Sequence, residues 1–111
     1  MFSALVRVLM DDETYRSLQN ELVQAPEKGT VMPGCGGLRK IRVEAPARGK
    51  GNRGGNRVIY LHIPEANRID FLAIYSKNER DDLDAGQKRK LTALATLART
   101  EALRMSAEKR K

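Results

Sequence analysis

RVIYLHIPEANRIDFLAIYS, residues 57–76, predicts two β-strands joined by a short turn. The segments Arg57–Ile63 and Arg68–Ser76 are rich in the β-branched and aromatic residues that favour strands. Pro64–Asn67 carries the turn signals between them. Strands that are neighbours in sequence usually pair, so an antiparallel meander is the expected arrangement.

A third strand is expected upstream, at Leu38–Val43, where the string LRKIRV alternates apolar and basic residues. A period of two turns one face of a strand toward the core and the other toward solvent. The inward face holds Ile41 and Val43, and the outward face holds Lys40 and Arg42. The glycine-rich, basic segment Ala45–Asn56 follows, so this strand and Arg57–Ile63 are expected to form a hairpin with a long loop.

An amphipathic helix is expected at Glu13–Gln24, with an N-cap at Asp11 or Asp12 and an end at Pro26. Its apolar residues recur at helical spacing, at Tyr15, Leu18 and Leu22. The preceding Phe2–Leu9 fits either a short helix or a strand. The N-terminal region therefore predicts one helix or a helical hairpin.

A final helix is expected at Ala85–Arg104, because Asp84 and Gln87 have the spacing of a capping box. One apolar stripe follows at helical spacing. Its members are Leu91, Leu94, Ala95, Ala98 and Ala102. We expect this stripe to pack against the sheet, with a surface for a protein partner as the alternative.

These elements predict a single α+β domain over residues 1–111. Residues 1–25 are helical, 36–77 form an antiparallel sheet of three strands, 84–104 form the last helix, and 105–111 form a frayed polar tail. Glu27–Gly37 is a connector with two turns.

The composition excludes several classes of protein. Three Tyr, two Phe and no Trp are too few aromatics for a base-stacking RNA binder. The single cysteine, Cys35, excludes an internal disulfide and has no Cys or His at ligand spacing, so we expect a cytoplasmic protein without a metal site. The apolar runs are too short to cross a membrane.

Positive charge is concentrated in one part of the chain. The nineteen positions from Arg39 to Arg57 hold seven basic residues and one acid, whereas the whole chain has a net charge of +7. Such a local excess indicates a site for a polyanion, and nucleic-acid phosphate is the first candidate.

Three strings of this sequence are distinctive: GGLRKIRV at 36–43, RGKGNRGGNRVIYLHI at 48–63 and AIYSKNERDDL at 73–83. They resemble the RelE/HigB superfamily of bacterial toxins, and most of all its HigB-type branch. The resemblance extends from about residue 2 to residue 97 and implies a RelE-like α+β fold. It also implies a metal-independent endoribonuclease that needs no cofactor, cuts mRNA in the ribosomal A site and stops translation. The implied partners are mRNA, rRNA and a cognate helix-turn-helix antitoxin.

The resemblance also implies site residues. The paired basic residues of the family fall on Lys40 and Arg42, its central catalytic arginine on Arg57, and a further cation on Lys77. RNA or ribosome contacts are expected from a second group: Arg39, Arg48, Lys50, Arg53 and Asn78. Asn78 stands where several members have an arginine, and no clear counterpart of their assisting tyrosine is found.

The family ordinarily opens with a β-strand, whereas Met1 and Phe2 align with the start of its first helix. Either the start of this sequence is drawn too late, or the chain is a trimmed or degenerate copy that lacks the strand. This motivates an alternative function, a degenerate toxin that binds RNA or ribosomes without cleaving. A third reading is a role inside an antitoxin complex that controls its own promoter, although no helix-turn-helix pattern in this chain predicts direct DNA contact.

Structural explanations compete with some of these assignments. Exposed strand faces often carry Lys and Arg for solubility alone. The segment Arg48–Asn56 is either a basic loop that grips RNA or simply a flexible hairpin tip. His62 shares a face with Val58 and Tyr60 and not with Arg57, so a packed or rim position is expected for it.

Overall fold

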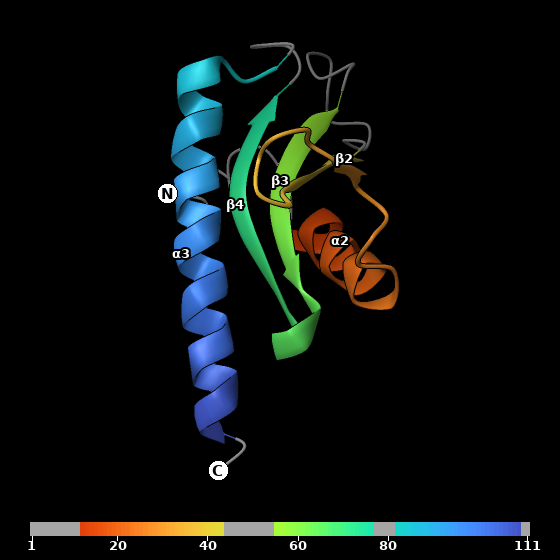
Figure 1. The fold of residues 1–111 in the computed structure, drawn as a ribbon. Helices are drawn as coiled ribbons and strands as arrows, with labels where there is room; N and C mark the ends of the chain where they lie inside the picture. Colours follow the sequence, from red (N-terminus) through yellow and green to blue (C-terminus); the bar gives the residue numbers. More distant parts are fainter. Residues whose placement is uncertain (1–11, 44–54, 77–81, 110–111) are drawn as a thin grey trace.

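The computed structural model describes residues 12–43, 55–76 and 82–109 (Figure 1). The elements in chain order are α2 (Asp12–Gln24), β1 (Thr30–Val31), β2 (Arg39–Val43), β3 (Asn56–Ile63), the 3-10 turn η1 (Pro64–Ala66), β4 (Arg68–Ser76) and α3 (Ala85–Lys109). The expected α+β fold is confirmed: an N-terminal helix, an antiparallel sheet and a C-terminal helix. The predictions made for residues 2–9 and for an absent first strand lie outside the described residues.

Within the described residues, the sheet has four antiparallel strands in the order β1-β2-β3-β4. The three predicted strands are present close to their expected bounds. The fourth, β1, lies in the segment that was expected to be only a connector. It has two residues, Thr30 and Val31, which pair with Lys40 and Arg39. A strand this short leaves no alternation to detect in a stretch that also carries turn signals.

The two helices cover opposite faces of the sheet (Figure 1). The apolar face of α2, with Leu18 and Leu22 buried, packs on one face together with Tyr15. The sheet residues of this first core are Ile41, Val43, Val58, Tyr60 and Ile74, with Ile69 and Phe71 at its margin. The inward face predicted for Ile41 and Val43 is therefore the face under α2.

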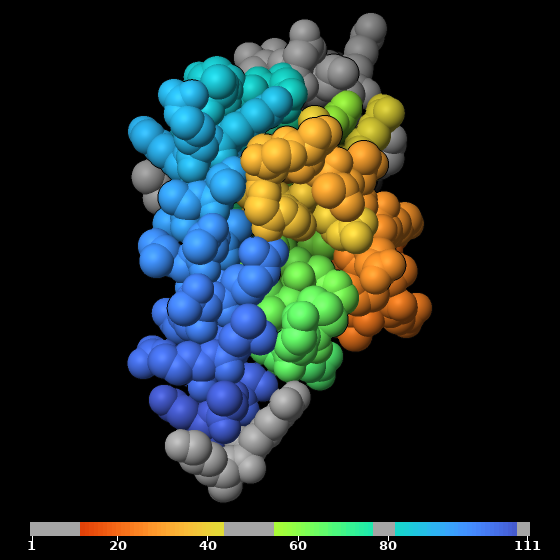
Figure 2. Space-filling model, viewed as in Figure 1, coloured from red at the N-terminus to blue at the C-terminus, as the bar shows by residue number. Residues whose placement is uncertain are grey.

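A second core lies between the sheet and α3. Its buried sheet residues are Ile59, Leu61, Ile63 and Tyr75, and its buried helix residues are Ala95 and Ala102. The connector adds Met32, Cys35 and Leu38 to this core. Figure 2 shows the connector lying against α3, and Arg99 Nη2 donates a hydrogen bond to the Gly36 carbonyl across that contact, at 2.7 Å.

The two ends of α3 differ in how well they were predicted. At its start, the capping box forms: the Gln87 N–H donates to Asp84 Oδ1 at 2.8 Å, and the Asp84 N–H donates to Gln87 Oε1 at 3.0 Å. At its other end, the helix continues to Lys109, so the expected polar tail is helical up to that residue. Helix-forming residues such as Ala107 and Glu108 allow this extension without burying any apolar face.

The apolar stripe of α3 packs on the sheet only in part. Ala95 and Ala102 are buried and Leu91 and Ala98 pack beside them, as expected. Leu94, however, is 50% exposed, which corrects its assignment to the core. The buried positions of the stripe, Ala95 and Ala102, carry small side chains, which lets the helix lie close to the strands.

Pairing between β3 and β4 shifts once. Ile59 pairs with Ala73, whereas the next residue, Tyr60, pairs with Phe71. Leu72 is therefore the extra residue of a β-bulge, which changes which face the following β4 side chains take. Between the bulge and the end of β4, the register places Tyr75 opposite Arg57.

Candidate nucleic-acid interface

Two predicted site arginines are directly opposite each other in the sheet. Arg42 on β2 and Arg57 on β3 are Cα partners, and Arg57 in turn pairs with Tyr75 on β4. Directly opposite residues of antiparallel strands point to the same face, with Cα atoms about 4.5–5.5 Å apart. Arg42, Arg57 and Tyr75 therefore form one row across three strands. We call this row the arginine row.

Lys40 lies in the next row on the same face. It pairs with Ile59, two residues along β3 from Arg57. Diagonal neighbours of this kind lie roughly 7–8 Å apart, within reach of long side chains. The register therefore brings Lys40, Arg42 and Arg57 together on one face, and alternation along the strand predicted this for Lys40 and Arg42.

The face in question is the one that α3 partly covers. Leu38 and Ile59, which share it, are fully buried in the core under α3. Along β2 the side chains pass from buried Leu38 to half-buried Lys40 and exposed Arg42. The expected outward, basic face is thus the continuation of a core surface, and it lies toward the end of the sheet where β4 finishes and α3 begins (Figure 1).

An acidic residue joins this basic face to α3. The Lys40 ammonium Nζ lies 3.4 Å from Asp82 Oδ1, and the Lys88 Nζ lies 2.9 Å from Asp82 Oδ2. The Leu83 N–H also donates to Asp82 Oδ1, at 2.8 Å. Asp82 therefore bridges a cation of β2 and a cation of the first turns of α3.

These contacts determine the charge state of the bridge. The hydrogen bond from Lys88 is the main cause that lowers the pKa of Asp82 to about 2, with further help from the Leu83 N–H and from Lys40. The same carboxylate raises the pKa of Lys88. Asp82 is therefore an anion, and Lys88 a cation, throughout the physiological range of pH.

Arg39 lies on the other face of β2, under the α2 side. Its Nη1 donates to the carbonyl oxygens of Glu27 at 3.0 Å and Gly29 at 2.8 Å. The side chain expected to contact RNA is thus engaged with the backbone of the α2–β1 connection, on the side away from Lys40 and Arg42. Successive side chains of a strand point to opposite faces, so Arg39 lies on the face opposite to Lys40 and Arg42.

The remaining predicted site residues lie outside the described residues. They are Lys77, Asn78, Arg48, Lys50 and Arg53. The expected basic loop Arg48–Asn56 is described only at Gly55 and Asn56, which are both buried.

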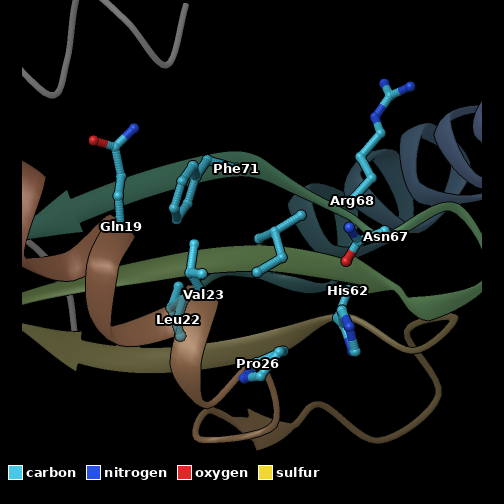
Figure 3. Close-up of a pocket in the computed structure, with 9 residues that line it drawn as sticks. Gln19, Leu22, Val23, Pro26, His62, Asn67, Arg68 and Phe71 are labelled. Atoms are coloured by element: carbon cyan, nitrogen blue, oxygen red, sulfur yellow. The ribbon is translucent and has the colours of Figure 1, made fainter.

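His62 has the rim position that its alternation predicted. It is half-buried and lines a pocket of about 330 Å³ between α2 and the β3–β4 hairpin (Figure 3). Leu22, Val23 and Phe71 are among the apolar side chains around it. This pocket is on the α2 side, so the sheet separates His62 from the arginine row.

Three residues of this region were not predicted from the sequence: Tyr75, Asp82 and Lys88. Tyr75 is almost fully buried, and a strand register that included the bulge would have placed it beside Arg57. In the sequence, Asp82 is only one of two neighbouring acids that precede the last predicted helix. No local pattern in the sequence predicts its pairing with Lys40, because the two residues are 42 positions apart.

The described residues, 12–43, 55–76 and 82–109, contain neither a cluster of metal-ligand side chains nor a membrane-spanning helix. Within those ranges, no group of three or more His, Cys, Asp or Glu side chains is arranged to hold a metal ion. No described helix combines the length and apolarity needed to cross a membrane.

The chain matches a protein-family model. The family is described as the RelE toxin of the RelE / RelB toxin-antitoxin system, and the match covers residues 12–109. That range includes both helices and all four strands that the structure describes.

Proposed function

The chain belongs to the RelE toxin family of toxin–antitoxin systems, and we propose that it is an endoribonuclease that cleaves mRNA in the ribosomal A site. The observation that carries this proposal is the register of β2 and β3, which sets Arg42 and Arg57 side by side with Lys40 in the next row. Three cations on one face suit a phosphodiester group that carries negative charge.

The reaction proposed here requires no metal. The ribose 2′-oxygen forms a bond to the adjacent phosphorus while the bond to the 5′-oxygen of the next nucleotide breaks. The products are a 2′,3′-cyclic phosphate and a 5′-hydroxyl end. One proton leaves the 2′-hydroxyl and one is delivered to the leaving oxygen, so the proton count is conserved.

Negative charge grows on the non-bridging phosphate oxygens in this transition state. We assign Arg57 to stabilise that charge, because it stands in the middle of the arginine row. The planar guanidinium of Arg42 is assigned to donate hydrogen bonds to the same phosphate. Lys40 is assigned as the electrostatic partner or general base, and Lys77 as a further phosphate contact.

The partners proposed for this chain follow from the same family. A cognate antitoxin is implied by membership of a toxin–antitoxin family. We further propose that the chain lies in the HigB-like branch, with a helix-turn-helix antitoxin, and that it acts in the cytoplasm, where ribosomes and mRNA are found.

The test is to express the protein under tight control and to map mRNA 5′ ends on programmed ribosomes. Arg57→Ala should lower the cleavage rate by about 10²–10³, the usual effect of removing one preorganised charge stabiliser. Arg68→Ala is the matched control. Arg68 is also an arginine of this sheet, but it forms an ion pair with Asp70 at the start of β4. If Arg57→Ala is as toxic as the wild type, the assigned site is wrong.

Binding without cleavage is the other outcome of this experiment. A wild-type protein that binds ribosomes, with an affinity that falls steeply with salt, and leaves mRNA intact would be a non-catalytic binder. New mRNA ends that depend on Arg57 exclude that function.

A further inference from the structure

Asp82 lies between two ammonium groups that come from different elements. One oxygen of its carboxylate faces Lys40 of β2, and the other faces Lys88 of α3. The two ion pairs of Asp82 thus connect the beginning of α3 to the basic face of the sheet.

Fold stability does not explain this arrangement. The side chains of Lys40 and Asp82 are 31% and 43% exposed, and ion pairs this accessible contribute little to the folding equilibrium. A lysine ammonium on its four-carbon stem is otherwise free to take many positions. A carboxylate near it restricts those positions, which matters only where the location of the charge has a use.

We propose that Asp82 is a positioning residue that holds the Lys40 ammonium beside the arginine row, while Lys88 offsets the negative charge of Asp82. This inference rests on the proposed function, because it assigns a use to Lys40 in RNA cleavage. Without Lys88, the Asp82 carboxylate would repel an approaching phosphate. With Lys88 at 2.9 Å, the three groups together keep a positive charge.

The Asp82→Asn variant separates positioning from other roles. Asparagine keeps an oxygen that can accept the Leu83 N–H, so the local turn retains its hydrogen bond. It removes one negative charge, so attraction of RNA phosphate should not weaken. It also releases Lys40, so the catalytic step should slow. The expected result is a kcat lower by about 10- to 100-fold with a KM no higher than that of the wild type.

Asp70→Asn is the matched control. Asp70 is also an aspartate in an ion pair with a basic side chain, 2.7 Å from Arg68 Nε, and it lies away from the arginine row on β4. This variant should leave both constants unchanged. Asp82→Glu, which restores the charge with a longer reach, should recover part of the lost kcat.

The alternatives give different kinetic patterns with RNA on programmed ribosomes. A rise in both kcat and affinity would mean that Asp82 restrains the site, and a fall in affinity would mean that it only supports the local fold. Either result overturns the positioning role. Wild-type cleavage with an unchanged Asp82→Asn variant also overturns it and leaves the proposed function intact. A wild-type protein that does not cleave overturns both.

A second measurement tests the bridge without using activity. The ionisation of the Asp82 carboxyl can be followed by carbon NMR in the wild type, in Lys40→Met and in Lys88→Met. If both ammonium groups hold the carboxylate, its pKa rises in each variant, and more in Lys88→Met, whose lysine makes the shorter contact. An Asp82 pKa that is indifferent to Lys40 removes the basis of the proposal.

Discussion

Arg42 on β2 and Arg57 on β3 are Cα partners in an antiparallel pair. Like charges placed directly opposite each other on one sheet face repel, which is destabilising for the pair. A phosphate group between two arginine forks turns this repulsion into shared attraction. The relationship therefore suits the proposed role of this face in binding RNA phosphate.

The effects of replacing Arg42 and Arg57 on the cleavage rate should be non-additive. If both act on one phosphate, Arg42→Ala and Arg57→Ala each slow cleavage, and the double variant loses less than the product of the two single losses. Single-turnover cleavage of mRNA on programmed ribosomes measures all three rates. Losses that simply multiply would mean that the two side chains act at separate places.

Arg39→Met should affect stability and not cleavage. The Arg39 guanidinium holds the carbonyl oxygens of Glu27 and Gly29, and hydrogen bonds to charged groups contribute about 1.5–3 kcal/mol. Urea unfolding should show a free energy of unfolding lower by about that amount. Lys28→Met, which removes an exposed ion pair with Glu21, is the control and should change it by less than about 1 kcal/mol.

A cleavage defect in Arg39→Met, measured on protein that remains folded, would contradict this assignment. It would show that Arg39 contacts RNA, as the resemblance to the toxin family implies.

Tyr60→Phe should destabilise the protein by about 1–3 kcal/mol. The fully buried Tyr60 hydroxyl donates to the Pro26 carbonyl at 2.7 Å and accepts from the Gly29 N–H at 2.8 Å. Phenylalanine leaves both backbone groups without this partner. Urea unfolding of the variant at neutral pH measures the loss, and an unchanged midpoint would show that water replaces the hydroxyl.

The same tyrosine predicts a loss of stability at alkaline pH. Burial raises the pKa of Tyr60 above its ordinary value of 10.0. Above pH 10 the unfolded chain therefore releases this proton while the folded chain retains it, so stability falls as pH rises toward the folded pKa. Between pH 9 and 11, the free energy of unfolding should fall more steeply with pH for the wild type than for Tyr60→Phe. Parallel curves would contradict the prediction.

Asp84→Ala should weaken the start of α3 by about 0.5–2 kcal/mol. It removes the carboxylate that accepts the Gln87 N–H, one half of the capping box. Thermal unfolding with circular dichroism measures the change. Asp84→Asn retains the accepting oxygen and should recover most of it, whereas an equal loss in both variants would point to charge and not to capping.

The local elements of this fold could be predicted because their signals are local. Period-two alternation at Ile41 and Val43, helical spacing at Leu18 and Leu22, and the Asp84–Gln87 cap each depend on residues a few positions apart. The charge excess that includes Lys40, Arg42 and Arg57 is equally visible, and parity alone places Arg42 and Lys40 on one face. The identities and spacing of side chains suffice for conclusions of this kind.

Tertiary structure decided which partners those side chains meet. The bulge at Leu72, the pairing of Arg57 with Tyr75 and the bridge from Lys40 to Asp82 depend on strand register and on where α3 crosses the sheet. The engagement of Arg39 with the Gly29 carbonyl depends on the path of the connector. Such contacts join residues far apart in the chain, and the packing of two cores on opposite faces of one sheet determines them together. No single stretch of sequence contains that information.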